Sequence, residues 1–70
     1  MMFEILLSCK PEELQYHAER IAQELRQEDV EPFIRTLWKR VPELSVEQEK
    51  KLHQLGRKTL KRFHMSRIRD

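Results

Sequence analysis

The 70-residue chain has one cysteine, one glycine and no asparagine. A single cysteine excludes an internal disulfide and a zinc site built from several thiolates. The scarcity of residues that favour turns is typical of a helical protein. Apolar runs such as Ile5–Leu7 are too short to span a membrane, and the N-terminus lacks the basic and long apolar regions of a secretory signal. We therefore expect a cytoplasmic helical protein with no membrane partner.

Charge is abundant but unevenly distributed. Charged residues make up 37% of the chain. Residues 1–49 hold six Lys/Arg and eleven Asp/Glu, a net charge of −5, whereas residues 50–70 hold eight Lys/Arg and one Asp, a net charge of +7. Such a division indicates either a basic surface for an anionic partner or two halves that attract each other, within one chain or between chains.

The first eight residues alternate loosely, with Phe3, Ile5 and Leu7 on one side. This pattern suggests a short strand. An isolated strand needs a partner, and no second strand is evident. Residues 1–8 are therefore predicted to be either a strand that pairs with another chain or an apolar arm packed on the helices.

Two helices are predicted over residues 9–28 and 29–41. The first is amphipathic, with Leu14, Ala18, Ile21, Ala22 and Leu25 on one face. A continuous helix would bury Pro32 in its interior, where proline removes a hydrogen bond and clashes one turn back. A continuous helix would also turn Leu25 and Leu37 toward different sides. Both this rotation of the apolar face and the proline are explained if Asp29 caps a new helix. A kinked continuous helix is the alternative.

A third helix is predicted over residues 45–64, followed by a basic tail over 65–70. Ser45 and Gln48 have the spacing of a capping box. Gly56 lies on the apolar face, and a glycine inside a helix costs about 1 kcal/mol relative to alanine. A close crossing with another helix would compensate for that cost. The second helix is predicted to expose Glu31, Arg35, Lys39 and Arg40.

These elements predict an all-α fold of three helices in a single domain over residues 1–70. The predicted core comprises Leu14, Ile21, Leu25, Phe33, Leu37, Trp38, Leu52, Leu55, Leu60 and Phe63. A chain this short is marginally stable alone, so we expect a homodimer. The apolar residues predicted to mediate this interaction are Phe33, Leu37, Trp38, Leu52, Leu55, Gly56, Leu60 and Phe63.

The third helix also carries a basic face. With the tail it comprises Lys50, Lys51, Arg57, Lys58, Lys61, Arg62, Arg67 and Arg69. Lys and Arg contacts with phosphate dominate nucleic-acid affinity, so binding of nucleic acid is the alternative function. The alternative without a binding partner is that this basic face is simply exposed to solvent and offsets the acidic first half of the chain. A helix-turn-helix arrangement is disfavoured because Glu47 and Glu49 occupy the first turn, where base contacts are expected.

Residues suited to catalysis are scattered. His17, His53 and His64 lack the spacing of metal ligands on one helix, and Cys9 has no adjacent base, so it is predicted to be a buried thiol. The glutamates are expected to form solvated faces and pairs such as Glu47–Lys51. We expect no catalytic residue, metal, cofactor or small-molecule substrate, and therefore no enzyme.

Four segments together carry a resemblance to a known family. They are residues 18–24 (Ala-Glu-Arg-Ile-Ala-Gln-Glu), 37–40 (Leu-Trp-Lys-Arg), 42–49 (Pro-Glu-Leu-Ser-Val-Glu-Gln-Glu) and 55–63 (Leu-Gly-Arg-Lys-Thr-Leu-Lys-Arg-Phe). Over residues 14–69 the chain resembles the C-terminal dimerisation domain of glutamyl-tRNA reductase. The resemblance implies a helical homodimer module linked to tetrapyrrole synthesis, without chemistry of its own. Lys61, Gly56 and Pro32 depart from the family pattern.

Overall fold

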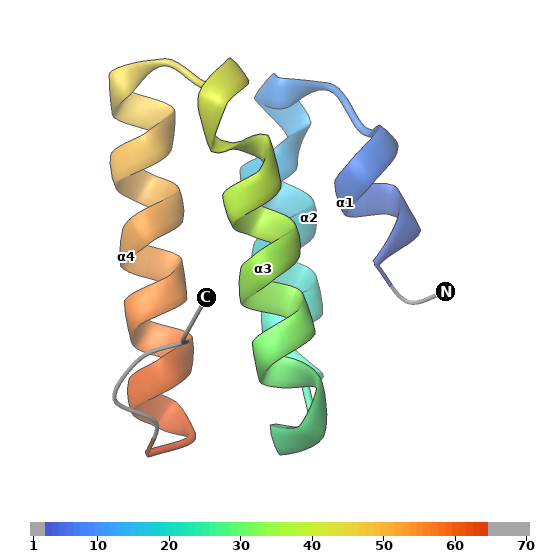
Figure 1. The fold of residues 1–70 in the computed structure, drawn as a ribbon, viewed down its shortest axis with the longest axis vertical. Coiled ribbons are helices and arrows are strands. Elements are labelled where there is room, and N and C mark those ends of the chain that lie inside the picture. Colours follow the sequence, from blue (N-terminus) through green and yellow to red (C-terminus); the bar gives the residue numbers. More distant parts are fainter. Residues whose placement is uncertain (1–2, 65–70) are drawn as a thin grey trace.

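The computed structural model describes residues 3–64, which form helices without a strand. In chain order these elements are α1 (Glu4–Ser8), α2 (Pro11–Gln23), the 3-10 turn η1 (Gln27–Asp29), α3 (Val30–Arg40), the 3-10 turn η2 (Val41–Glu43) and α4 (Val46–Arg62). Helices α2, α3 and α4 pack side by side, and α1 packs against α2 and α3 away from α4 (Figure 1). The predicted all-α class is confirmed for the described residues.

Glu4–Ser8 forms the short helix α1 rather than the strand that the alternation suggested. The helical period changes which residues face inward: Leu6 is completely buried, whereas Ile5 and Leu7 are exposed. Phe3 also packs on the core, with its ring 5.9 Å from that of Phe33. The segment therefore rests on the helices of its own chain. Residues 1 and 2 of the predicted arm lie outside the described residues.

The chain breaks between α2 and α3, so the kinked continuous helix is not formed. Arg26 has an extended backbone, and α3 begins at Val30 after a 3-10 turn. Pro32 lies in the first turn of α3, as predicted, where its missing amide hydrogen costs little. Asp29 occupies the N-cap position, but its side chain makes no capping hydrogen bond, and this part of the prediction is wrong.

Helix α4 begins with the predicted capping box. The Ser45 hydroxyl accepts a hydrogen bond from the Gln48 amide at 3.2 Å, and the Gln48 side chain accepts one from the Ser45 amide at 3.0 Å. At its other end, Phe63 is the C-cap and His64 takes the left-handed conformation with φ of 59°. That conformation usually belongs to glycine at this position.

The core lies between the helices of a single chain. Five of the ten predicted core residues are buried, namely Leu14, Leu25, Phe33, Leu37 and Leu52. The other five, Ile21, Trp38, Leu55, Leu60 and Phe63, are half-buried against them. The core also contains Leu6, Ala18, Ala22, Val30 and Ile34, which the predicted set omitted.

Gly56 marks the crossing of α3 and α4. A Cβ added at this position would lie 2.8 Å from Cη2 of Trp38 and 3.5 Å from Cδ1 of Ile34. No side chain fits there without movement of the indole. The indole is in turn stacked on His53, with ring centroids 4.6 Å apart. The predicted close helix crossing at Gly56 is confirmed.

Arg40 is buried, contrary to its predicted place on the exposed face of α3. Only 7% of the residue is accessible. Its guanidinium donates to the carbonyl oxygens of Leu6 at 2.8 Å and Cys9 at 2.7 Å, and to the Glu43 carboxylate at 2.8 Å. Arg40 therefore ties the end of α1 to the end of α3. Helical periodicity alone treats an arginine as exposed and gives no sign of carbonyl partners supplied by a distant segment.

Candidate nucleic-acid interface on α4

The basic face predicted on the third helix lies on α4. Helix α4 buries Leu52, Gly56 and Thr59 against α2 and α3, which turns its remaining arc to solvent. The exposed arc carries six cationic side chains, which we name the α4 basic surface: Lys50, Lys51, Arg57, Lys58, Lys61 and Arg62. Arg67 and Arg69, which were predicted to extend it, lie outside the described residues.

Five of the six cations have no partner within residues 3–64. Arg62 is the sixth, and it donates to the Ala22 carbonyl oxygen at the end of α2, at 2.9 Å. The side chains of Lys50, Lys51, Arg57, Lys58 and Lys61 make no hydrogen bond or ion pair with the described residues. The predicted Glu47–Lys51 pair is not formed. No carboxylate of residues 3–64 therefore forms an ion pair with these five side chains.

Arginines elsewhere in the chain do have partners. Arg35 lies 2.8 Å from the Glu31 carboxylate, and Arg40 is bound to Glu43. Arg20 donates to the Tyr16 hydroxyl at 2.9 Å, and this hydrogen bond raises the pKa of the Arg20 guanidinium above its ordinary value. The lysines outside α4, Lys10 and Lys39, likewise have no side-chain partner within residues 3–64. What distinguishes α4 is that five unpartnered cations lie on one helix.

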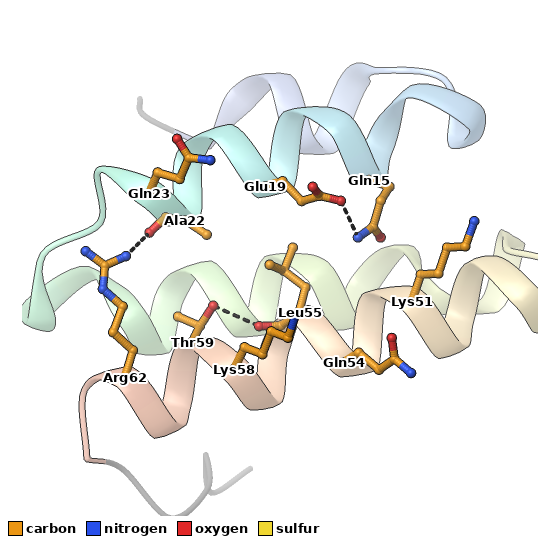
Figure 2. A pocket seen from close by; sticks show the side chains of 10 residues that line it. All are labelled: Gln15, Glu19, Ala22, Gln23, Lys51, Gln54, Leu55, Lys58, Thr59 and Arg62. Atoms are coloured by element: carbon orange, nitrogen blue, oxygen red, sulfur yellow. Dashed lines mark hydrogen bonds between the residues drawn. The ribbon is translucent and has the colours of Figure 1, made fainter.

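A groove runs between α2 and α4 (Figure 2). Its volume is about 520 Å³, and its walls bring Lys51, Lys58 and Arg62 of α4 opposite Gln15 and Glu19 of α2. Gln15 donates to the Glu19 carboxylate at 2.8 Å, while its buried Oε1 has no partner. No ion pair joins the acidic α2 to the basic α4 within the described residues. The opposite net charges of residues 1–49 and 50–70 therefore do not produce an ion pair between α2 and α4 within the described residues.

A second, shallower hollow lies on the outer side of α4. It has a volume of about 260 Å³ and is lined by Gln54, Arg57, Lys58 and Lys61. Lys58 and Gln54 border both this hollow and the groove beside α2. The prediction omitted Gln54 because it considered charge alone. Its position three and four residues before Arg57 and Lys58 places it on the same helix face.

The apolar residues predicted to bind a partner lie mainly inside the chain. Phe33, Leu37, Leu52 and Gly56 are buried by the bundle itself. Trp38, Leu55, Leu60 and Phe63 are half-buried against the same core. A partner would reach the first four only if the bundle opened. Within residues 3–64, the large apolar side chains that are exposed are instead Ile5, Leu7, Tyr16 and Val46.

The described residues provide no metal-binding cluster beside the basic surface. Residues 3–64 contain no cluster of three His, Cys, Asp or Glu side chains arranged to hold a metal ion. Cys9 was predicted to be a buried thiol, but it is only half-buried. Its carbonyl oxygen accepts a hydrogen bond from Arg40. Within the described part of the chain, no helix combines the length and apolar character needed to cross a membrane.

Comparisons with protein-family models, with curated proteins and with solved structures find no match for this chain. The resemblance to the dimerisation domain of glutamyl-tRNA reductase therefore stays a prediction. Function is therefore inferred from the geometry of the helices and from the distribution of their charges.

Proposed function

We propose that this protein is a non-catalytic helical module that binds nucleic acid through the α4 basic surface. The observation that carries this proposal is the group of five exposed cations without an internal partner: Lys50, Lys51, Arg57, Lys58 and Lys61. Neighbouring like charges on one helix face repel each other and weaken the helix slightly. An anionic polymer relieves that repulsion, and the release of its condensed counterions drives binding.

The closed core supports this proposal over one that requires a partner subunit. Phe33, Ile34 and Leu37, the centre of α3, are completely buried in one chain. The bundle therefore needs no second copy to cover its most apolar helix. The α4 basic surface remains exposed and available for a partner.

Titration of fluorescently labelled nucleic acid tests the proposal. We expect anisotropy to rise on addition of protein to a labelled duplex or single strand at about 50 mM salt, and the affinity to fall as salt is raised. Replacing Arg57, Lys58 and Lys61 together by glutamine should weaken binding at least tenfold, by roughly 1.4 kcal/mol or more. The matched control is Lys39→Gln, which removes an exposed cation from α3 and should leave the affinity within about twofold. No binding to either nucleic acid would contradict the proposal.

Self-association is a second candidate, favoured by a different observation. Glu12 and Glu13, in the first turn of α2, are exposed and form no ion pair within residues 3–64. The acidic α2 of one copy could therefore meet the α4 basic surface of another. This contact would make the protein the self-associating interaction module that was predicted from the sequence. Such a role is also what the resemblance to the dimerisation domain of glutamyl-tRNA reductase, an enzyme of tetrapyrrole synthesis, implies. Because such a contact joins unlike surfaces, it forms a closed homodimer only if its rotation closes.

Sedimentation velocity distinguishes this candidate from a monomer. Self-association through opposite charges predicts a sedimentation coefficient that rises with protein concentration at low salt and falls when salt is added. Charge reversal of Glu12 and Glu13 to lysine should abolish the larger species. A coefficient that stays at the monomer value at every concentration and salt level would exclude self-association.

A further inference from the structure

We infer that the α4 basic surface binds the phosphate backbone of duplex nucleic acid, independently of its sequence, and is centred on Lys58. This inference rests on the proposed function and specifies the class of nucleic acid. Lys58 lines both the outer hollow of α4 and the groove beside α2, so it lies between the other cations. Arg57 and Lys61 flank it in the outer hollow, and Lys51 in the groove.

The scarcity of exposed aromatic side chains around the cations of α4 favours a duplex. Proteins that bind single strands place exposed aromatic side chains beside their basic groove, because bases stack on them. Among the described aromatic residues, Phe33 is buried and Trp38 is stacked on His53. Tyr16 is exposed but lies on α2, where its hydroxyl binds Arg20. Phe63, the C-cap of α4, is half-buried against the core, and the Arg62 guanidinium covers its ring at 5.2 Å from the centroid. No fully exposed aromatic side chain stands among the cations of α4 in the described part of the chain.

The rigid spacing of the cations along α4 also suits the high charge density of a duplex. Helix α4 is held on the bundle from Leu52 to Thr59, so its cations project from a rigid rod. From Lys50 to Lys61 this rod extends roughly 16 Å, at about 1.5 Å per residue. A duplex presents a charge about every 1.7 Å along its axis, so a rigid array of this length faces several phosphates at once. A flexible single strand would have to be ordered to do the same.

Carboxylates near the α4 basic surface limit it to contacts with the phosphate backbone. The first turn of α4 carries Glu47 and Glu49, whose negative charges oppose insertion of this end of the helix into a groove of the duplex. Glu19 stands on the α2 wall of the groove beside Lys58. Phosphates are therefore best accommodated on the outer hollow, where Arg57, Lys61 and the Gln54 amide can donate to their oxygens. Contacts of this kind position a duplex without reading its bases.

Anisotropy titrations with four labelled probes test the inference. The probes are two DNA duplexes of unrelated sequence, one of their single strands and an RNA duplex, each about 20 nucleotides per strand. We expect at least one type of duplex to bind about fivefold or more tightly than the single strand, and the two DNA duplexes to agree within about threefold. Equal or tighter binding of the single strand, or a clear preference for one DNA sequence, would overturn the inference while leaving the proposed function intact. Failure of all four probes would overturn both.

Three variants locate the contact. Each phosphate contact that is removed lowers the slope of log affinity against log salt by about one, so Lys58→Gln should lower it by about one and the triple variant of Arg57, Lys58 and Lys61 by about three. Glu19→Gln should tighten duplex binding by about twofold because it removes a nearby negative charge. An unchanged slope in the triple variant, with circular dichroism confirming that it is folded, would overturn the placement on α4.

Discussion

Helices α3 and α4 both carry several cations but use them differently. The two arginines of α3 have carboxylate partners, and Arg40 also holds two carbonyl oxygens of the segment around α1. The cations of α4 face solvent without partners in the described residues, apart from Arg62. The comparison teaches that Arg40 of α3 is committed to the fold, whereas five of the six cations of α4, like Lys39 of α3, have no partner within the described residues and are available to another molecule. The substitutions below test this division, starting with the largest expected effect.

Arg40→Met should destabilise the protein by about 3 kcal/mol. The change leaves the carbonyl oxygens of Leu6 and Cys9 and the Glu43 carboxylate without their donor, and loss of one partner from a buried pair is strongly destabilising. Urea unfolding followed by circular dichroism measures the loss. Arg40→Lys keeps the charge but offers fewer directed donors, so its stability should fall between that of the original chain and that of Arg40→Met. A loss below about 1 kcal/mol for Arg40→Met would show that α3 does not depend on this arginine.

Gly56→Ala should destabilise the protein by about 1 kcal/mol. Alanine gains about 1 kcal/mol in helix propensity, but its Cβ would meet the Trp38 indole at 2.8 Å, and overpacking costs about 1–3 kcal/mol. A double-mutant cycle with Trp38→Phe, which removes the contacting indole atom, measures the coupling. The cost of alanine should disappear when Gly56→Ala is combined with Trp38→Phe. A stabilising Gly56→Ala in the original background would contradict the close crossing of α3 and α4.

His64→Gly should stabilise the protein by slightly under 1 kcal/mol. The left-handed backbone of His64 costs a residue with a side chain roughly 1 kcal/mol, and glycine adopts it without that cost. Part of the gain is lost to the greater freedom of glycine in the unfolded chain. Thermal unfolding provides the measurement. A lower melting temperature would indicate that α4 does not end in this conformation.

Lys58→Gln and Lys61→Gln should change stability least, by about 0.5 kcal/mol or less. Neither side chain has an internal partner to lose within the described residues, and removing like charges from one helix face is slightly favourable. Chemical denaturation at low salt should show both variants unchanged or slightly more stable than the original chain. A loss of more than about 1 kcal/mol would mean that these lysines support the fold as Arg40 does.

The local features of this fold could be predicted from the sequence because they depend on neighbouring residues. The capping box at Ser45 and the first-turn position of Pro32 are both set within one helical turn. The glycine crossing could be inferred because its cost in a helix requires compensation. The all-α class followed from the same periodic patterns.

The features that sequence could not supply depend on distant segments. Arg40 is buried because carbonyl oxygens more than thirty positions away receive its hydrogen bonds. Leu6 faces inward because Glu4–Ser8 folds as a helix on α2 and α3, whereas a short apolar run is ambiguous between helix and strand. The basic face of α4 was predicted from charge. Its lack of internal partners, which gives it interest as an interface, could be seen only in the folded chain.

Nuclear magnetic resonance mapping of a bound duplex tests the central claim most directly. Unlabelled duplex DNA is added to ¹⁵N-labelled protein at low salt, and the amide shifts are followed residue by residue. The account predicts that the largest changes lie on α4 around Gln54, Arg57, Lys58 and Lys61, with little change over Val30–Arg40 in α3. Largest changes in α3 or α1, or no changes at any duplex concentration, would contradict it.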